Sequence, residues 1–400
     1  MTLTEWLDRI SAIHPVGWDL GLERVGKIGL ALDLLHPADK VVLVAGTNGK
    51  GSTCEYLAQI AMSAGLKVGK STSPHLFRFN ERIVVDGDAV DDETIIAAFE
   101  LIDRARGETT LTYFEFAALA SLMIFRQAKV DLAILEVGLG GRLDAMNIVE
   151  PDLSIITSVS LDHQSWLGDN REDIGREKAG IMRAGIHCLI SDRDPPLSLI
   201  DMAMQMAVPI ELIGRDFEFD QQSDGRLPRD SFAVARRASE YLSLAVSETE
   251  LRRIGTETTL PGRLTLLSGH CPILLDVAHN PAAAEHLVTY VESLDVEGDI
   301  HAIVGIYEDK DIDGVLAPLV RLVKTWHLTD LDEGRAETAQ NLACRLAEHH
   351  AGKTSTYAKI SEAAKTLESL VSENDLILIL GSFPVVAGGL EYFDKSLDRV

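Results

Sequence analysis

The chain has 400 residues, of which 46% are apolar and 25% are charged, as in an ordinary globular protein with a large buried core. Its net charge of −25, without any block of Lys and Arg, argues against nucleic acid or an anionic membrane as a partner. The length predicts two or three domains. Four scattered cysteines without a C-x-x-C pair fit a reducing compartment, so we expect a cytoplasmic protein.

The first residues predict an amphipathic helix. Thr2 and Glu5 have the spacing of a capping box, and the charged-then-apolar pattern of a signal peptide is missing. At the other end, the longest uncharged run, 376–390, contains proline and glycine and is too short to span a bilayer. Neither segment therefore indicates a membrane protein.

Strand-like apolar runs alternate with helical segments along most of the chain. This alternation predicts an α/β fold with mostly parallel sheets. Residues 108–128 are expected to form a largely buried helix. The predicted strands are 41–46, 67–70, 131–136, 153–158, 186–191, 273–277, 301–306, 325–329 and 375–381.

The domain boundary is expected near residues 260–262. The polar, turn-rich stretch 221–230 predicts an exposed loop, and a second series of strands and helices starts after Pro261 and Gly262. We therefore predict a P-loop domain over residues 1–260 and a smaller Rossmann-like domain over 261–400.

The stretch VVLVAGTNGKGST, residues 41–53, is the strongest local signal in the chain. A buried strand leads into a turn with three glycines, Gly46, Gly49 and Gly51, and a helix follows. In this arrangement backbone N–H groups and the start of a helix bind phosphates. The pattern indicates a nucleotide triphosphate site.

Side chains in this turn strengthen that interpretation. Lys50 can place a charge on the β- and γ-phosphates, and Ser52 or Thr53 offers a hydroxyl to Mg²⁺. The match to the standard P-loop is imperfect, because Val44 stands where its first glycine belongs and Gly51 separates the lysine from the hydroxyl. A tight strand–helix connection without a ligand is the alternative.

Further polar clusters follow predicted strands, where open α/β sheets build their sites. Residues 71–83 follow the second strand, and Glu136 ends the third before a glycine-rich loop. A carboxylate there is a natural Mg²⁺ ligand, although it could also only cap a helix. Asp162 and His163 follow the next strand, where a structural histidine is equally expected.

The remaining candidates are Lys178 in the charged segment 171–182 and several residues of the second domain. This segment is predicted to be a charged helix, and on its own Lys178 would be one more solvated or ion-paired lysine of that helix. The second-domain candidates are Arg263, Asp276, His279, Asn280 and Ser382.

Taken together, these blocks resemble the folylpolyglutamate synthase/dihydrofolate synthase branch of the Mur ligase superfamily, over nearly the whole chain. The pairing of LTYFEF with DVAHNP is most similar to the bifunctional bacterial enzymes. The blocks are DLGLERV (19–25), VAGTNGKGST (44–53), SPHL (73–76), LTYFEF (111–116), LEVGLGGRLDA (135–145), SLDH (160–163), REKAGI (176–181), PGR (261–263), DVAHNP (276–281) and DKD (309–311).

The resemblance implies roles for individual residues. ATP would contact Thr47, Asn48, Gly49, Lys50, Gly51, Ser52, Arg263 and Asp276. Two Mg²⁺ ions would be held by Ser52, Ser73, Glu136 and His163. Lys178 would be carbamylated. The pterin substrate would contact Asp19, Leu20, Thr112, Tyr113, Phe114, Glu115, Leu143, Asp144 and Ala145. Ser382 and His279 would lie near the phosphates and the incoming glutamate. Catalytic roles would fall on Lys50, Lys178, His163 and His279.

Three positions depart from the family pattern. Met146 and Gln164 stand where the family usually has threonine, and the family's ATP-contacting asparagine is replaced by Asp230 or Ser231. A carboxylate can accept hydrogen bonds from a nucleotide but cannot donate them as an amide does.

The implied activity is ATP-dependent ligation of L-glutamate to dihydropteroate and to the γ-carboxylate of tetrahydrofolates, through an acyl phosphate. The resemblance also implies a monomer. A peptidoglycan Mur ligase is disfavoured, because only about 45 residues precede the phosphate turn and a further domain needs about 100. A P-loop ATPase without ligase activity and a non-catalytic folate- or nucleotide-binding protein are the two competing hypotheses.

Overall fold

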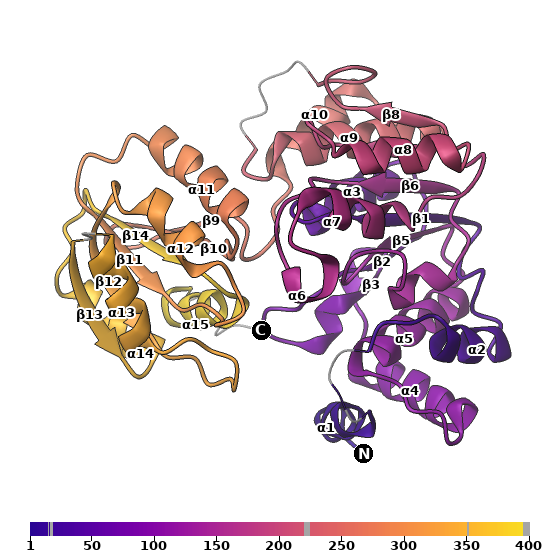
Figure 1. The fold of residues 1–400 in the computed structure, drawn as a ribbon, viewed down its shortest axis with the longest axis horizontal. Coiled ribbons are helices and arrows are strands. Elements are labelled where there is room, and N and C mark those ends of the chain that lie inside the picture. Colours follow the sequence, from indigo (N-terminus) through magenta and orange to yellow (C-terminus); the bar gives the residue numbers. More distant parts are fainter. Residues whose placement is uncertain (15, 17–18, 220–224, 350–351, 395–400) are drawn as a thin grey trace. The chain divides into compact units, whose positions relative to one another are not determined.

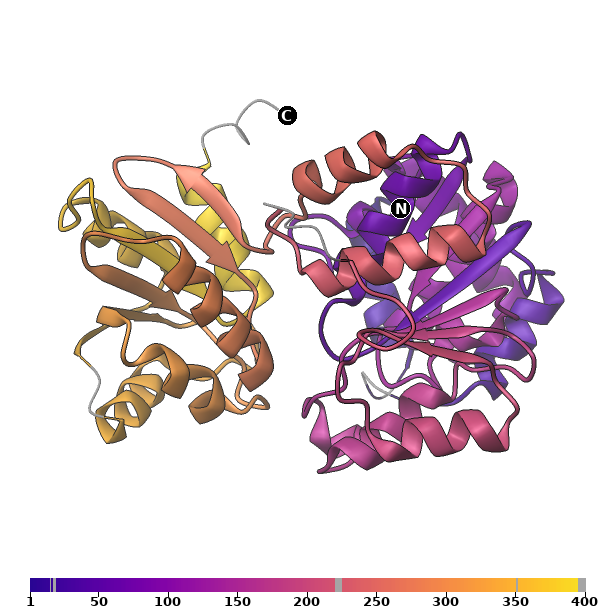
Figure 2. The ribbon, with the colours of Figure 1, turned by 90° about the horizontal axis from the view of Figure 1, so that it is seen from above.

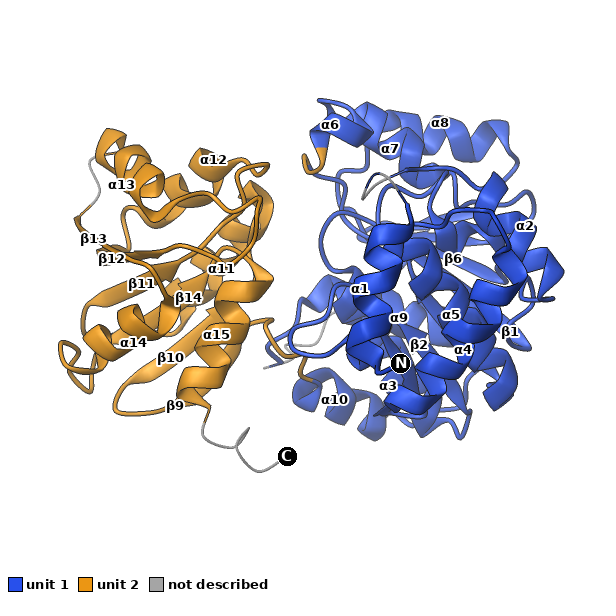
Figure 3. Ribbon diagram, turned by 90° about the horizontal axis from the view of Figure 1, so that it is seen from below, with its two compact units in different colours: residues 1–160, 164–258 blue, residues 161–163, 259–400 orange. Residues whose placement is uncertain are grey.

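The computed structural model describes the chain except for residues 15, 17–18, 220–224, 350–351 and 395–400 (Figure 1). The described residues form two compact units, which Figure 3 shows in different colours. Unit 1 comprises residues 1–160 and 164–258, and unit 2 comprises residues 161–163 and 259–400. The division after residue 258 lies close to the boundary expected near 260, while residues 161–163 group with the second unit.

Unit 1 is built on an eight-stranded sheet with the order β4-β3-β2-β5-β1-β6-β7-β8. The strands from β2 to β8 in this order run parallel, and β3 and β4 add an antiparallel edge. The strands are β1 Lys40–Ala45, β2 Val68–Ser71, β3 Ile83–Val85, β4 Asp88–Ala89, β5 Leu132–Glu136, β6 Leu153–Ile156, β7 Cys188–Ile190 and β8 Ile210–Leu212.

Helices cover this sheet, so its central strands are apolar on both sides. In β1 every residue after Lys40 is buried, as expected for a central parallel strand. Helix α3 packs on β1, β2 and β5, and α5 packs on β2 and β3. The helices are α1 Leu3–Ile13, α2 Glu23–Ala31, α3 Lys50–Ser63, α4 Asp92–Arg106, α5 Tyr113–Ala128, α6 Gln164–Leu167, α7 Arg171–Ala179, α8 Leu197–Gln205, α9 Arg229–Tyr241 and α10 Glu248–Glu257, with 3₁₀ turns η1 Phe79–Arg82 and η2 Ala145–Ile148.

Capping residues set where two of these helices begin. The expected capping box of α1 is present, with Thr2 and Glu5 bonded to each other's backbone N–H groups. Helix α5 begins at Tyr113 instead of residue 108, because Thr112 and Glu115 form a second capping box. Such a box ends the non-helical stretch by satisfying two N–H groups of the first turn.

Unit 2 has a six-stranded sheet with the order β13-β12-β11-β14-β10-β9, in which only β9 is antiparallel to its neighbour. Helices α14 and α15 lie on one face, and α12 and α13 on the other (Figures 2 and 3). The elements are β9 Thr265–Ser268, β10 Pro272–Asp276, α11 Pro281–Ser293, β11 Ile300–Val304, α12 Ile312–Leu316, η3 Ala317–Leu319, β12 Val323–Thr329, α13 Ala339–Glu348, β13 Lys353–Tyr357, α14 Ile360–Glu368, β14 Leu376–Leu380 and α15 Phe383–Phe393.

The predicted α/β class with mostly parallel sheets is confirmed, and each of the nine predicted strands is present within a few residues. Other expectations were wrong. The charged helix ends at Ala179 instead of 182, and Arg229 and Asp230 begin α9 instead of lying in a loop. Residues 221–224 of that loop lie outside the described residues. Strands β3, β4, β8, β9 and β13 were missed. Among the described residues, no helix is long and apolar enough to cross a membrane.

A row of polar side chains runs across strands β11, β12 and β13 of the unit 2 sheet. The rings of His301 and His327 lie 2.7 and 3.1 Å from the Thr325 hydroxyl, and His327 Nδ1 lies 3.0 Å from the Tyr357 hydroxyl. Burial lowers the pKa of His327 to about 4, and the charges of His301 and Lys353 act in the same direction.

We expect this histidine to make the protein less stable in acid. Between pH about 6.5 and about 4 the unfolded chain binds a proton at residue 327 that the native state does not. The free energy of unfolding should therefore fall by up to roughly 3 kcal/mol as the pH drops through this range. Urea unfolding across the range tests this. The decrease should be smaller in His327→Gln and unchanged in His270→Gln, which alters an exposed histidine. Equal decreases in all three proteins would contradict the assignment.

Candidate active site

The phosphate turn joins β1 to α3 at the carboxyl edge of the unit 1 sheet. Gly46 has a φ of +150°, and a Cβ there would lie 1.7 Å from the Thr157 hydroxyl, so only glycine fits. Gly49 is the N-cap of α3 in the left-handed conformation, with a φ of +86°. As a glycine, this N-cap has no side chain that could bond the N–H groups of the first turn, and such groups are suited to bind an anion.

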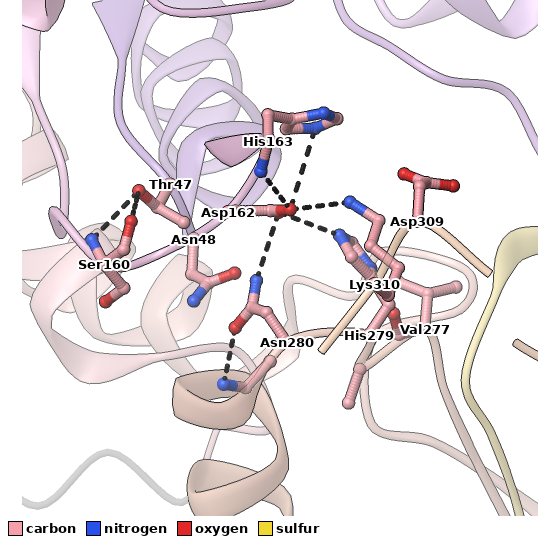
Figure 4. Close-up of polar contacts among 12 residues, drawn as sticks. Thr47, Asn48, Ser160, Asp162, His163, Val277, His279, Asn280, Asp309 and Lys310 are labelled. Atoms are coloured by element: carbon pink, nitrogen blue, oxygen red, sulfur yellow. Dashed lines mark hydrogen bonds and ion pairs between the residues drawn. The ribbon is translucent and has the colours of Figure 1, made fainter. Parts of the chain in front are cut away.

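Contacts to the loop after β6 hold the turn in place. The Thr47 hydroxyl donates to the Ser160 carbonyl at 3.1 Å and accepts from the Ser160 N–H at 3.0 Å (Figure 4). The Asn48 N–H donates to the Ser158 hydroxyl at 3.2 Å. The first two residues of the turn are thus fixed before any ligand is bound.

Lys50 is folded back over the turn. Its Nζ donates to the carbonyls of Gly46 and Thr47, each at 3.2 Å, and lies 3.9 Å from Glu136 Oε1. The lysine charge is therefore held at the mouth of the turn, next to a buried carboxylate.

Ser73 and Glu136 meet at the same edge. They follow β2 and end β5, which are neighbours in the sheet, and the Ser73 N–H donates to Glu136 Oε2 at 3.1 Å. Ser52, in the first turn of α3, is buried as well. Among the described residues there is no group of three or more His, Cys, Asp and Glu side chains that could hold a metal. Two hydroxyls and one carboxylate suit a Mg²⁺ ion that takes its other ligands from phosphate and water.

Lys178 lies in the last turn of α7 and is only 2% exposed. A buried lysine of this kind is not the solvated helix lysine that the sequence alone would suggest.

Asp162 organises a polar cluster within unit 2 (Figure 4). Its Oδ1 accepts from Lys310 Nζ at 2.6 Å and from the His163 N–H at 2.8 Å. Its Oδ2 lies 3.4 Å from His279 Nε2 and 3.5 Å from Asn280 Nδ2. Burial raises the pKa of Asp162, but the hydrogen bond from His279 and the neighbouring positive charges outweigh burial and hold it well below its usual range.

The cluster fixes the main chain at His163, which has a φ of +51°. A residue other than glycine stays in this conformation only where its surroundings hold it there.

The other candidates of unit 2 are more dispersed. Arg263 stacks on the Phe383 ring at 5.3 Å, and Asp276 accepts from the N–H groups of Leu264 and Ala278. Burial raises the pKa of Asp276. The Ser382 hydroxyl caps α15 and donates to the Gly305 carbonyl at 2.7 Å.

The segments expected to bind the pterin also lie together in unit 1. Arg24 donates to the Asp19 carboxylate at 2.5 Å, to the Asp19 carbonyl at 2.8 Å and to Glu115 at 3.1 Å. His14 Nε2 lies 3.1 Å from the same aspartate. Leu20 packs on the core of unit 1. The loop at 19–20 is thereby tied to the first turn of α5.

The glycine loop after β5 approaches the same helix. A Cβ at Gly138 would lie 2.5 Å from the Phe114 ring, so this glycine permits close packing. Asp144 is buried and accepts from the N–H groups of Leu139 and Met146, each at 2.9 Å. Burial raises the pKa of Asp144 to about 6. Leu143 is half-buried and Ala145 buried beside it.

Of the two residues that could replace the family's asparagine, only one touches the turn. The Ser231 hydroxyl donates to the Gly49 carbonyl at 3.3 Å and is buried. Asp230 is instead paired with Arg193 at 2.7 Å.

The sequence matches two family models and is similar to known proteins over nearly its whole length. A Mur ligase middle domain model matches residues 44–263, and a Mur ligase glutamate ligase domain model matches residues 262–383. The dihydrofolate synthase/folylpolyglutamate synthase of Escherichia coli is 38% identical over 98% of this chain and 96% of its own. The chain belongs to this family of Mur ligases.

Two solved structures of the family are also similar. E. coli FolC in complex with DHPP and ADP has a TM-score of 0.95 and 37% identity, and the match covers 100% of this chain and 99% of that chain. A bifunctional folylpolyglutamate synthase/dihydrofolate synthase with Mn, AMPPNP and L-glutamate bound has a TM-score of 0.91 and 38% identity over 98% of each chain. The resemblance, the fold class and the ATP-dependent ligase activity expected from the sequence are thus confirmed.

Sequence reasoning did not include three charged residues that contact the candidate site residues. Arg24 joins the two segments that are expected to bind the pterin, Lys310 donates to Asp162, and Arg82 lies beside the Tyr113 ring. Arg24 and Lys310 belong to family sequence blocks, and Arg82 belongs to the polar cluster after β2. Their charges mark them as candidates for a polar site, but the residues that Arg24 and Lys310 contact are distant in the sequence, so those contacts could not be predicted.

Proposed function

We propose that the chain ligates L-glutamate to dihydropteroate and to the γ-carboxylate of tetrahydrofolates, using ATP. The observation that supports this most strongly is that Lys50 and the uncapped start of α3 meet the Ser73–Glu136 pair at one sheet edge. That combination is suited to a nucleotide bound with a metal ion.

ATP would be bound along the phosphate turn and by residues of unit 2. The turn contributes the backbone and side chains of residues 47–52, and Arg263 and Asp276 are the proposed contacts in unit 2. Two Mg²⁺ ions would be held by Ser52, Ser73 and Glu136, and by His163. Bound Mg²⁺ supplies positive charge that neutralises the oxygens of the transferred phosphoryl group.

The reaction proceeds in two steps. An oxygen of the substrate carboxylate attacks the γ-phosphorus of ATP, which breaks the bond to ADP and forms an acyl phosphate. The α-amine of glutamate then adds to the activated carbonyl, loses a proton and expels inorganic phosphate. ATP is required because a free carboxylate is a poor acylating agent.

The protein contributes mainly positioning and charge. Lys50 stabilises the negative charge on the transferred group, and the N–H groups of α3 do the same from the other end of the turn. Because the turn is already fixed by Ser158 and Ser160, little reorganisation is needed during the reaction.

Lys178 is proposed to be carbamylated. Lys178 is buried. Carbamylation would replace its positive charge by a negative one, and this carbamate could be held by a metal ion or could orient the phosphoryl group. His279 and Ser382 are proposed to lie near the phosphates and the incoming glutamate.

The pterin would be bound by the segments that Arg24 joins and by the loop after β5. These residues are Asp19, Leu20, Thr112, Tyr113, Phe114, Glu115, Leu143, Asp144 and Ala145. The DHPP found in the E. coli FolC structure and the L-glutamate in the related one support these substrates. We further propose a monomeric enzyme of the cytoplasm.

We expect Ser231, and not Asp230, to affect nucleotide binding. Ser231→Ala removes the hydrogen bond to the Gly49 carbonyl and should weaken ATP binding by about three- to tenfold, the usual range for one neutral hydrogen bond. Asp230→Ala should leave ATP affinity unchanged, since its partner is Arg193. Titration with a non-hydrolysable ATP analogue measures both. A larger effect at residue 230 would reverse the assignment.

The proposed reaction is tested by ADP release from the purified protein. Dihydropteroate or a tetrahydrofolate is supplied with and without L-glutamate. A ligase requires both substrates for sustained release. Release that does not depend on glutamate would support a P-loop ATPase, and no release with any substrate would support a non-catalytic relative.

A further inference from the structure

Arg82 is an arginine without a carboxylate partner at the edge of the proposed site. Its Nε donates to His75 Nδ1 at 2.8 Å, and among the described residues no acceptor lies within hydrogen-bond distance of its Nη1 and Nη2. Arg104 and Arg229 also make no ion pair with a described residue, but both are exposed, whereas Arg82 is half-buried. In this acidic protein an unpaired arginine away from bulk water is unusual, because burying such a charge is costly.

Neighbouring groups hold the guanidinium without neutralising it. The Phe79 and Tyr113 rings lie 5.7 and 5.6 Å from its central carbon, which is within the range of cation–π contacts. Since an arginine Nε can only donate, His75 Nδ1 must accept, and the histidine ring is therefore neutral. Two rings and one imidazole thus hold the guanidinium, while the Glu136 and Glu81 carboxylates act on its charge without forming an ion pair with it.

The backbone places this charge beside the metal edge. Arg82 directly precedes β3, which pairs with β2 so that Ile83 lies opposite Ser71. The Thr72 N–H donates to the Arg82 carbonyl at 3.1 Å, one residue before Ser73. The Glu136 carboxylate also acts electrostatically on Arg82. Arg82 is therefore close both to the Ser73–Glu136 pair and to Tyr113.

We propose that Arg82 binds the carboxylate of the pteroate or folate substrate, the group that ATP activates. This inference rests on the proposed function. The fork of Nη groups matches an oxyanion, which could in principle be this carboxylate or a phosphate of the nucleotide. The carboxylate is favoured because Tyr113 belongs to the proposed pterin segment, while Lys50 and the start of α3 already serve the phosphates.

The role of Arg82 follows from the reaction. A carboxylate that must attack a phosphate needs its own charge screened and its oxygens oriented, and a fixed guanidinium does both. His75, Phe79 and Tyr113 are then positioning residues for Arg82.

The test compares dihydropteroate with its carboxamide, in which the carboxylate is replaced by a neutral group of similar shape. Both are titrated into the full chain with ADP and Mg²⁺ present. The wild-type protein should prefer the acid by about tenfold to a hundredfold, as expected for a charge-assisted hydrogen bond. In Arg82→Gln this preference should fall to about one while amide affinity is retained, and Arg82→Lys should be intermediate.

The control is Arg78→Gln, which alters an exposed arginine of the same segment that is paired with Asp92. It should keep the wild-type preference. An unchanged preference in both Arg82 variants, or equal losses for acid and amide, would overturn the proposal. A loss confined to ADP affinity would overturn it too and assign Arg82 to the nucleotide. If the wild-type protein bound neither pterin, the proposed function itself would fail.

Discussion

Replacing Lys50 by methionine is expected to reduce the rate of ADP formation by about a hundredfold to a thousandfold, as for other electrostatic groups of this kind. Methionine keeps the length and much of the volume of the side chain but removes the charge from the mouth of the turn. Because the polar contacts of Lys50 with the described residues are limited to two carbonyls of the turn and the Glu136 carboxylate, the fold should tolerate the change.

The effect should be on kcat more than on the KM for ATP, because the charge that the lysine stabilises grows as the phosphoryl group is transferred. Steady-state rates with saturating dihydropteroate and glutamate measure this. Lys67→Met, which alters an exposed lysine bonded to the Ala128 carbonyl, is the control and should retain its rate. A Lys50→Met variant with wild-type kcat would remove Lys50 from the mechanism.

Lys178→Ala is expected to lose activity by about a hundredfold or more, since it removes a proposed anionic group next to the phosphoryl transfer. If the active form of Lys178 is a carbamate, the alanine variant has lost a negatively charged group and not a positively charged one. Short carboxylic acids such as acetate or formate should then restore part of the activity, whereas small amines should not.

Incubation with labelled carbon dioxide gives an independent measurement. The wild-type protein should take up the label and Lys178→Ala should not. The exposed lysine variant Lys67→Met serves again as the control. Wild-type activity in Lys178→Ala would contradict a catalytic role, and rescue by amines instead of acids would show that the lysine acts as a cation.

The parallel strands and the phosphate turn were predictable because each is determined by residues that are close together in the sequence. Strands buried on both faces are continuous apolar runs, and a glycine-rich turn has a specific spacing. The β3–β4 hairpin was missed, although its turn has a recognisable sequence. Asp86 and Gly87 form its two-residue turn with φ values of +55° and +92°, the pattern that Asp-Gly favours.

Partnerships between distant residues could not be predicted in this way. Arg24 meets Glu115 across 91 positions, and Lys310 meets Asp162 across 148. Nothing in the sequence shows that Arg82 lacks a carboxylate partner, since that depends on which side chains the fold brings together. The resemblance to a family supplied candidate residues, but not the residues that hold them in place.

The close approach of Gly46 to Thr157 has a consequence for how this enzyme can vary. Even a methyl group at position 46 would overlap the threonine side chain, and the φ of +150° would strain any residue with a Cβ even if residue 157 were shortened. Thr157 is itself anchored through its N–H to the Ala45 carbonyl, so moving it away from position 46 would break this hydrogen bond. The bend between β1 and the phosphate turn therefore leaves no room for a side chain at its first residue.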